Sequence, residues 1–570
     1  MKEMLLTAIN AKYIHTNPAI YSLRAYARTY AEHIELAEYT INQSTQEILR
    51  DIYQKQPKMV AFSCYIWNIK VVEELVEELA LVLPETVIWA GGPEVSYDAR
   101  TFLEKYPQVT GVMRGEGEKT FLQLCEYYLE GKEGLGQIRG ITFRTPQGEI
   151  LSNESQLPVP MDEIPFAYEE EQDTAHKIVY YESSRGCPFS CSYCLSSIDK
   201  SVRFRSLSLV TRELQIFLDR KVPQVKFVDR TFNCNHEHAM GVWKYIQEHD
   251  NGVTNFHFEI GADLFYPEEI QLLSRLRPGL VQLEIGVQSV NLRTIAEIHR
   301  TMDLTKLAGC VERIREGKNI HQHLDLIAGL PYEDKESFIH SFNQVYAMKP
   351  DQLQLGFLKV LKGSAMEEKA WEYGLKYQPR PPYEVLSTRW LSYGELLELK
   401  GVEEMVEIYY NSHQFSRTIQ ALESCFSSPY ALFLALNQYY ENHKLKGLSH
   451  SRLGRLEILR NFAIETDPGK QKWYQEHLLM DLYLRENSKT RPEWATDLSP
   501  YKEQIARFYK EEASTHCLLP GYENCTYRQL RTMTHLELFE KAEDGMELVL
   551  FDYQRRDPLT YNAWTYRRKL

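Results

Sequence analysis

Short apolar segments alternate with amphipathic stretches in two successive runs along the chain, and this alternation limits the fold more than any other sequence feature. The first run fills residues 1 to about 135, and the second extends from about residue 173 to 365. Strand-length apolar segments that alternate with helical patterns predict parallel strands whose connecting helices cover the sheet. We therefore expect an α/β protein with two parallel-sheet domains in succession.

The first run, residues 1–135, predicts a doubly wound, Rossmann-like sheet with strands at 4–9, 34–39, 59–64, 87–90 and 109–114. Ligands of such sheets bind outside the carboxyl ends of the strands. The residues expected there are Asn10, Ala11, Lys12 and Tyr13; Ser63, Cys64, Tyr65, Trp67 and Asn68; Gly91, Gly92, Pro93 and Glu94; and Gly115, Glu116 and Gly117. Glycines let a backbone approach a ligand closely, although these glycines could also form only tight turns.

Residues 136–172 predict a β-hairpin around Pro146-Gln147-Gly148 and then a proline-containing linker. The second run, residues 173–365, predicts a partial (β/α)6 barrel with its site at the carboxyl ends of the strands. Its strands are expected at 177–183, 225–231, 256–262, 281–289, 321–329 and 352–360. Residues 366–570 have a mostly helical pattern, with helices expected at 383–410 and 430–443, and no recognisable chemical motif. We expect this region to be accessory.

Three cysteines follow the first strand of the second run. Cys187, Cys191 and Cys194 have the spacing C-x3-C-x2-C, and thiolates at this density suit iron–sulfur clusters or zinc. Three ligands can hold three irons of a [4Fe-4S] cluster and leave the fourth iron open to a small molecule. Structural zinc needs four closed ligands, so a zinc site would have to recruit Cys234 or His236. The spacing therefore favours an open [4Fe-4S] cluster.

Length and composition narrow the class of protein. A chain of 570 residues is too long for one hydrophobic core, and its ten cysteines are too sparse for a disulfide framework. A formal net charge of -14 argues against a general electrostatic grip on nucleic acid. The start, MKEMLLTAINAKY, lacks a charged n-region before a long apolar stretch, and the sequence contains no run of about 18 apolar residues. We expect a cytoplasmic multidomain protein without a membrane partner.

The cysteine motif, with Tyr193 just before the third cysteine, closely resembles the signature of the radical S-adenosylmethionine (SAM) superfamily. The resemblance implies that the open iron binds SAM, and that a 5′-deoxyadenosyl radical abstracts a substrate hydrogen after one-electron reduction. The reductant would be an external protein of the flavodoxin or ferredoxin type. The stretches EIGVQS, followed by Arg300, and DLIAGLP look like those of oxygen-independent coproporphyrinogen oxidases.

Together these resemblances imply which side chains meet SAM. They are Tyr193, Glu259, Gln288, Ser289, Arg300 and Asp325. Taken singly, Glu259 or Asp325 could be a strand carboxylate paired with a base, and Arg300 a surface charge. The segment VDRTFN is expected to offer Asp229, Arg230 and Asn233 to the same cavity.

The domain order and the turns GGPEVS and RGEGEKTF resemble the cobalamin-binding subfamily of radical SAM proteins over about residues 1–365. The resemblance implies that the strand-end loops of the first domain bind cobalamin. The D-x-H-x-x-G motif of many cobalamin domains is absent, and His15 stands in the first loop in a different pattern. The lower axial position of cobalt is therefore open: no ligand, water, or a side chain from residues 63–68.

These resemblances imply methyl transfer to an unactivated carbon of a small-molecule or peptide substrate. The alternative is a radical SAM oxidoreductase, cyclase or rearrangement enzyme that transfers no methyl group. A tRNA methylthiolase would need a second cysteine-held cluster, but the first 170 residues contain only Cys64 and Cys125. A cobalamin sensor would not need an open iron. The sequence assigns no residue as a general acid or base.

Overall fold

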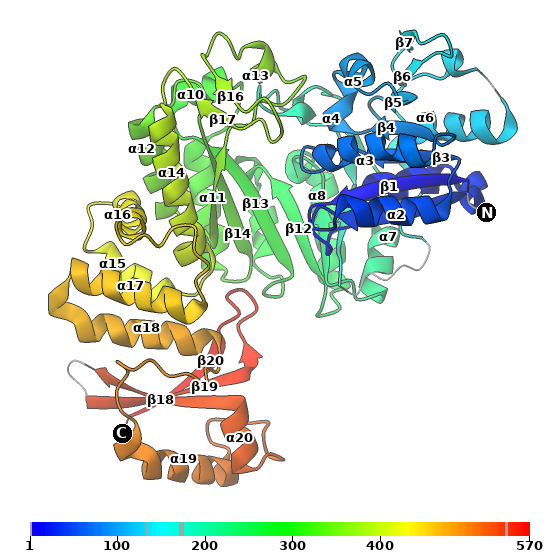
Figure 1. Cartoon of the computed structure of the whole chain (residues 1–570). Coiled ribbons are helices and arrows are strands. Elements are labelled where there is room, and N and C mark those ends of the chain that lie inside the picture. Colours follow the sequence, from blue (N-terminus) through cyan, green and yellow to red (C-terminus); the bar gives the residue numbers. More distant parts are fainter. Residues whose placement is uncertain (1–2, 133, 170–175, 542–544, 570) are drawn as a thin grey trace. The chain divides into compact units, whose positions relative to one another are not determined.

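The computed structural model describes residues 3–132, 134–169, 176–541 and 545–569 (Figure 1). It divides into two compact units, of which the first consists of Met1–Ser337 with Gly356–Tyr393 and the second of Phe338–Leu355 with Gly394–Leu570. The domain borders expected near residues 135 and 365 stay predictions. The expected end of the linker at residue 172 lies outside the described residues.

The first seven strands form one sheet in the order β2-β1-β3-β4-β5-β6-β7. The five strands of the first run pair in parallel. They are β1 (Met4–Asn10), β2 (Ile34–Thr40), β3 (Met59–Ser63), β4 (Val87–Gly91) and β5 (Gly111–Met113). The expected hairpin is β6 (Ile141–Arg144) and β7 (Ile150–Ser152), and it extends this sheet with antiparallel pairing.

Helices cover both faces of this sheet, which appears in blue and cyan in Figure 1. They are α1 (Pro18–Tyr26), α2 (Thr45–Lys55), α3 (Ile69–Val82), α4 (Pro93–Ser96), α5 (Ala99–Lys105) and α6 (Glu118–Cys125). Alternate residues of β1 enter separate cores: Leu5 packs in the core that contains Val72 of α3, and Leu6 in the core that contains Phe121 of α6. The doubly wound fold is therefore confirmed.

The second run forms a six-stranded sheet whose order, β15-β14-β13-β12-β11-β8, follows the sequence. Its strands are β8 (Ile178–Tyr181), β11 (Gln224–Phe227), β12 (Asn255–Ile260), β13 (Val281–Gln288), β14 (His321–Ala328) and β15 (Gln352–Phe357). Its main helices are α7 (Leu207–Asp219), α8 (His236–Glu248), α9 (Pro267–Leu273), α10 (Leu292–Glu297), α11 (Leu304–Glu316) and α12 (Lys335–Ala347). The order and the crossover helices confirm the partial barrel.

Two short strands, β16 (Lys376–Tyr377) and β17 (Val385–Ser387), precede the helical region. The helix expected from residue 383 therefore begins only at Tyr393. The helices that follow are α14 (Tyr393–Val406), α15 (Ser416–Glu423), α16 (Pro429–Asn442), α17 (Arg452–Thr466), α18 (Gln471–Arg485), α19 (Lys502–Thr515) and α20 (Tyr527–Met533). The helical character of this region is confirmed.

The chain ends in an antiparallel sheet that the sequence analysis did not predict. Its strands are β18 (Thr534–Lys541), β19 (Gly545–Arg556) and β20 (Ala563–Lys569). The alternation of Leu536 and Leu538 with Glu537 was a strand signal, because alternate residues of a strand face opposite sides.

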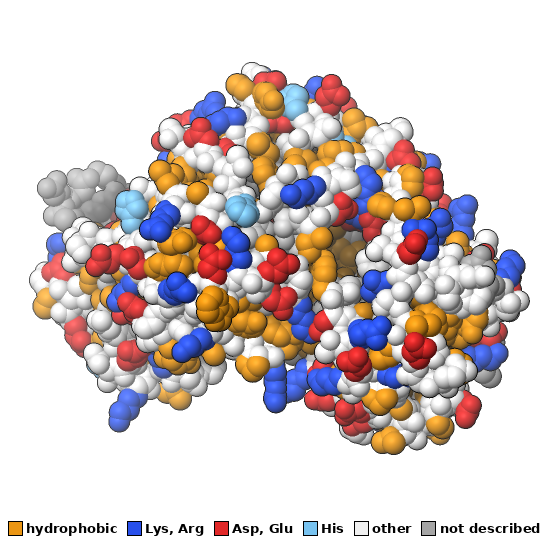
Figure 2. Space-filling model, turned by 90° about the horizontal axis from the view of Figure 1, so that it is seen from above, with side chains coloured by type: hydrophobic (Ala, Val, Ile, Leu, Met, Phe, Trp, Pro, Cys, Tyr) orange, Lys and Arg blue, Asp and Glu red, His pale blue; other side chains and the backbone are white. Residues whose placement is uncertain are grey.

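The surface and the helices give two further facts. Figure 2 shows acidic, basic and hydrophobic side chains interspersed over the face that it presents. Among the described residues, no helix is both long and apolar enough to cross a membrane.

Candidate functional site

The three motif cysteines lie on a loop that follows β8 and the short strand β9 (Ser184–Arg185). All three are free thiols, and Cys187 and Cys191 are only 8% and 7% exposed. Gly186 has φ +97°, and a Cβ atom there would clash with the carbonyl oxygen of Ser201. A side chain at residue 186 is therefore incompatible with the tight return of this loop toward β10 (Arg203–Phe204).

The donor set of this loop fits a cluster better than a single metal ion. Within the described ranges, no three His, Cys, Asp or Glu side chains converge closely enough to hold one metal. Structural zinc needs such convergence of four ligands, and the zinc alternative gains no support. The thiolates of a [4Fe-4S] cluster bind separate irons, so they need not meet at one point.

Arg300 lies beside the cysteine loop and is not a surface charge. Its Nη1 atom is 3.8 Å from the sulfur of Cys191 and 3.5 Å from the hydroxyl of Tyr193, and its Nη2 atom donates to the carbonyl of Gly286. Burial raises the pKa of the Cys191 thiol, while the guanidinium opposes that rise. The buried Nε atom of Arg300 has no hydrogen-bond partner. The side chain thus has an unused donor inside the site.

Two other predicted SAM contacts also carry buried polar atoms without hydrogen bonds. They are Oε1 of Gln288, where β13 ends in an irregular register with φ 71°, and Oδ1 of Asp325 on β14. The Nε2 atom of His323 is 3.1 Å from that Asp325 oxygen without hydrogen-bond alignment. Unsatisfied buried polar atoms are rare in proteins, and these fit a polar ligand such as SAM.

Ser289 has a different environment from these two residues. It is fully buried, and its hydroxyl donates to Glu333 at 2.6 Å. Glu333 is a site residue that the sequence analysis missed, although it closes the segment DLIAGLPYE. The pair joins the end of β13 to the turn after β14.

Charged side chains from three adjacent strands form a network that includes the predicted Glu259. Lys226 of β11 is 3.0 Å from Glu284 of β13 and 3.8 Å from Glu259 of β12. Burial and the charge of Glu284 raise the pKa of Glu259 to about 7. Despite its own burial, Glu284 has a pKa of about 2, because His257 and Lys226 stabilise its carboxylate. Of these four residues only Glu259 was predicted. Alternate positions such as His257 and Glu259 of β12 place their side chains on the same face of the strand.

Asp229 does not line a cavity as expected. It is fully buried and accepts hydrogen bonds of 2.6 Å from the hydroxyls of Ser183 and Ser184, which precede the cysteine loop. Burial raises the pKa of Asp229 to about 6. Asn233 exchanges two hydrogen bonds of 2.9 Å with the backbone of Gly261. Both residues tie strand ends together.

The loop after β1 pairs with the outer edge of β8. The amide of Ile178 donates to the carbonyl of Ile14 at 2.6 Å, and the amide of Thr16 donates to Ile178. The His15 ring stacks on Tyr180, and its Nδ1 atom contacts the Tyr180 hydroxyl. This edge of the barrel is therefore covered by the first sheet domain, as exposed edges usually are.

The predicted cobalamin residues of this loop and the next differ in exposure. Tyr13 is 71% exposed, whereas Asn10 is buried and donates to Glu38 at 2.9 Å. The rings of Tyr65 and Trp67 stack 4.4 Å apart, and Trp67 is 44% exposed. Those two aromatic residues offer a flat surface to a ligand.

Other predicted cobalamin residues support the backbone. Asn68 is fully buried and donates to the carbonyls of Ile9 and Ser63. Gly92 has φ +106°, and a Cβ atom there would lie 2.5 Å from the carbonyl oxygen of Cys64. This glycine allows a backbone approach that other residues would block.

The acidic residues of the last two loops have partners outside the first sheet. Glu94 accepts a hydrogen bond from Tyr383 and lies 3.4 Å from Lys362. Glu116 lies 3.1 Å from Arg185 and also pairs with Arg203. The cobalamin assignments of Ala11, Lys12, Gly91, Pro93, Gly115 and Gly117 stay predictions, like those of the residues above.

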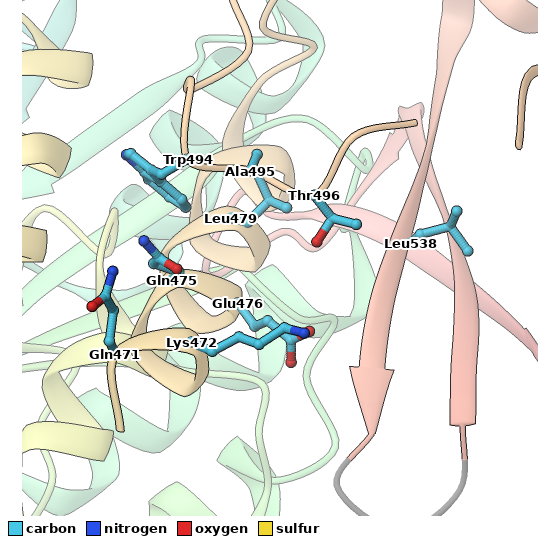
Figure 3. A pocket seen from close by; sticks show the side chains of 9 residues that line it. All are labelled: Gln471, Lys472, Gln475, Glu476, Leu479, Trp494, Ala495, Thr496 and Leu538. Carbon is cyan, nitrogen blue, oxygen red and sulfur yellow. The ribbon is translucent and has the colours of Figure 1, made fainter. Parts of the chain in front are cut away.

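A separate pocket of about 330 Å³ lies in the second unit (Figure 3). Its lining is Gln471, Lys472, Gln475, Glu476, Leu479, Trp494, Ala495, Thr496 and Leu538. Trp494 is held there by a hydrogen bond to Glu457 at 2.6 Å. The lining contains no cysteine or histidine, so we place the candidate site at the barrel.

Comparison with known families agrees with this placement. Residues 4–125 match the family described as the B12 binding domain, and residues 181–345 match the radical SAM superfamily. The chain therefore contains a B12 binding domain and a radical SAM domain. Residues 371–551 match a family described as a protein of unknown function, DUF4080. The predicted family and cofactor classes are thereby confirmed.

Two relatives and one structure show the range of similar proteins. TokK of Streptomyces tokunonensis, a cobalamin-dependent radical SAM methyltransferase, is 23% identical over 83% of this chain and 73% of its own length. The anaerobic magnesium-protoporphyrin IX monomethyl ester cyclase of Cereibacter sphaeroides is 22% identical over 55% of this chain. This chain spans only 53% of that cyclase.

The solved structure is that of OxsB, a cobalamin-dependent SAM radical enzyme, with aqua-cobalamin bound. It has a TM-score of 0.60 at 12% identity and covers 89% of this chain and 84% of its own. This likeness supports the fold.

Proposed function

We propose that the chain is a cobalamin-dependent radical SAM methyltransferase that acts on an unactivated carbon of a small-molecule or peptide substrate. The observation that carries the proposal is the pairing of the β1 loop with β8, the strand that leads into Cys187. It brings the first sheet domain and the cysteine motif into one compact unit. Similarity to TokK supports methyl transfer as the reaction.

When bound, the cluster and SAM supply hydrogen abstraction and cobalamin supplies a methyl group. The chain's own residues bind the cofactors, orient the substrate against them and exclude water. Cys187, Cys191 and Cys194 would hold the cluster, while Gln288, Asp325 and Arg300 offer buried polar atoms to SAM.

The first sheet domain would hold cobalamin. The stacked rings of Tyr65 and Trp67 offer a surface to the corrin ring. Gly92 lets the backbone pass close to its neighbouring strand end. The Nδ1 atom of His15 contacts the Tyr180 hydroxyl, which leaves the Nε2 atom as the ring nitrogen that could meet cobalt.

The cyclase relative supports a second candidate function, a radical SAM oxidoreductase or cyclase without methyl transfer. The two candidates differ in what becomes of SAM. Methyl transfer consumes SAM both as a radical source and as a methyl donor, and yields 5′-deoxyadenosine and S-adenosylhomocysteine. The second candidate yields 5′-deoxyadenosine alone.

The test is to purify the chain without oxygen, load it with iron, sulfide and hydroxocobalamin, and add SAM with a one-electron reductant. We expect retained cobalamin, iron–sulfur absorption and both SAM products. The variant Cys187→Ala/Cys191→Ala/Cys194→Ala should lose 5′-deoxyadenosine, whereas Cys517→Ala, at an exposed cysteine, should keep it. Retained cobalamin with no S-adenosylhomocysteine would overturn methyl transfer in favour of the second candidate.

A further inference from the structure

We propose that Glu116, in the turn after β5, and Glu118, the first residue of α6, are positioning residues for the cysteine loop of the barrel. They lie in the first sheet domain, yet their carboxylates pair with Arg185 and Arg203, the two arginines that flank the loop. The inference rests on the proposed assignment of the cluster to Cys187, Cys191 and Cys194.

Arg185 stands two residues before Cys187 and makes three ion pairs. Its Nη1 atom is 3.1 Å from Glu116, and its Nη2 atom is 2.9 Å from Glu118 and 2.7 Å from Glu182. The side chains of Arg185 and Glu118 are only 18% and 6% exposed. Neutralising Glu116 and Glu118 takes two of these three carboxylates from a guanidinium that is largely out of water, which is unfavourable.

Arg203 stands on the other side of the loop and binds the same turn. Its guanidinium pairs with Glu116, donates to the carbonyl of Val159 at 2.6 Å, and lies 3.6 Å from Asp199. The carbonyl of Asp199 accepts from the amide of Cys187 at 3.3 Å. Asp199 thus connects Arg203 to the backbone of Cys187.

The register of β9 and β10 shows why the glutamates are needed. Arg185 and Arg203 are direct partners across this two-stranded antiparallel ladder. Like charges directly opposite each other on adjacent strands repel and weaken the pairing. Glu116 contacts both guanidinium groups, and its carboxylate offsets that repulsion.

Closure of the ladder in turn fixes the start of the cysteine loop. Gly186, which separates Arg185 from Cys187, has a positive φ because the chain returns against Ser201. If β9 and β10 separate, the Cys187 backbone loses this restraint. The glutamates therefore act on the cluster through Arg185 and Arg203.

The experiment compares Glu116→Gln/Glu118→Gln with Glu35→Gln in the whole chain loaded with cluster and cobalamin. Glu35 is a matched control, because it lies in the same domain, pairs with Lys55 at 2.7 Å and is 30% exposed. We expect the double variant to lose iron to a chelator about tenfold faster than wild type, because the facing guanidinium groups of Arg185 and Arg203 lose the carboxylate that they share. Its reduced cluster should give an altered electron paramagnetic resonance spectrum.

A second variant separates repulsion from a general loss of packing. Adding Arg203→Gln to Glu116→Gln removes one of the two facing charges and should slow iron loss again, to within about threefold of wild type. If Glu116→Gln/Glu118→Gln loses iron at the wild-type rate and gives the wild-type spectrum, the inference is overturned and the proposed function stands. Unchanged iron loss together with lost cobalamin would also overturn the inference, and would assign the turn to the cobalamin site. A wild-type chain that takes up no cluster would instead overturn the proposed function, and this inference with it.

Discussion

At the scale of the residue, Glu259 is a carboxyl group whose ionisation the fold opposes. Its ordinary pKa is 4.5, and burial together with the nearby Glu284 carboxylate raises it to about 7. Lys226, at 3.8 Å, is too far away to hydrogen-bond to it. The folded chain therefore binds a proton at Glu259 more tightly than the unfolded chain does.

This shift has a defined sign in a stability measurement. The contribution of Glu259 is fully present below the unfolded pKa of 4.5 and is lost as the pH rises through about 7. Glu259→Gln, which cannot ionise, should therefore become the more stable chain as the pH rises, by up to about 3 kcal/mol at pH 8. Urea unfolding without SAM at several pH values measures this difference. A difference that stays constant between about pH 5 and pH 8 would contradict the raised pKa.

At the scale of the element, the turn between β4 and α4 requires glycine at residue 92. With φ +106° and a Cβ position 2.5 Å from the Cys64 carbonyl oxygen, Gly92→Ala meets both backbone strain and a clash. We expect the variant to lose about 3 kcal/mol of stability and to bind cobalamin more weakly. Gly115→Ala is the matched control, because φ is +72° there but nothing lies within 4 Å of the added atom. Its loss should be about 1 kcal/mol, and equal losses in urea unfolding would show that the clash is relieved.

The elements also show which structural levels the sequence could predict. Apolar runs and glycine turns are local signals, so the strands of both parallel sheets and the place of the cysteine loop were predicted. Ion pairs depend on register between distant segments. Lys226 and Glu284 are 58 residues apart, and Arg185 and Glu118 are 67 apart. A sequence pattern shows that these residues are polar, but only the folded strands show which of them meet. Glu116 illustrates this, because a glutamate in a glycine turn gives no sign of its partners Arg185 and Arg203.

At the scale of the whole molecule, one segment of the barrel's sequence belongs structurally to the unit that contains the helical region. Helix α12 belongs to the second run of strands and helices, yet residues 338–355 group with residues 394–570 as one compact unit. Within that unit Phe342 packs against Tyr430 and Phe433, with ring centroids 5.6 and 6.1 Å apart. The side chain of Asn343 accepts a hydrogen bond of 3.0 Å from the amide of Tyr430. The apolar face of α12 is thus covered by α16.

Truncation at two positions tests this dependence. A chain that ends at residue 393 keeps α12 but loses α16, so Phe342 and Tyr346 become exposed. Exposing two large side chains costs about 3–6 kcal/mol, a large part of the stability of a typical domain. We expect this chain to aggregate or to bind a hydrophobic dye, and to take up less iron than the full chain. A chain that ends at residue 497 keeps the contact of α12 with α16 and removes the core that contains Phe508, Leu530 and Leu550. It should load iron, although Tyr483 of α18 loses its packing against Phe551. Equal solubility and iron content in both truncated chains would show that the barrel does not need the helical unit, because α12 would then be stable without α16.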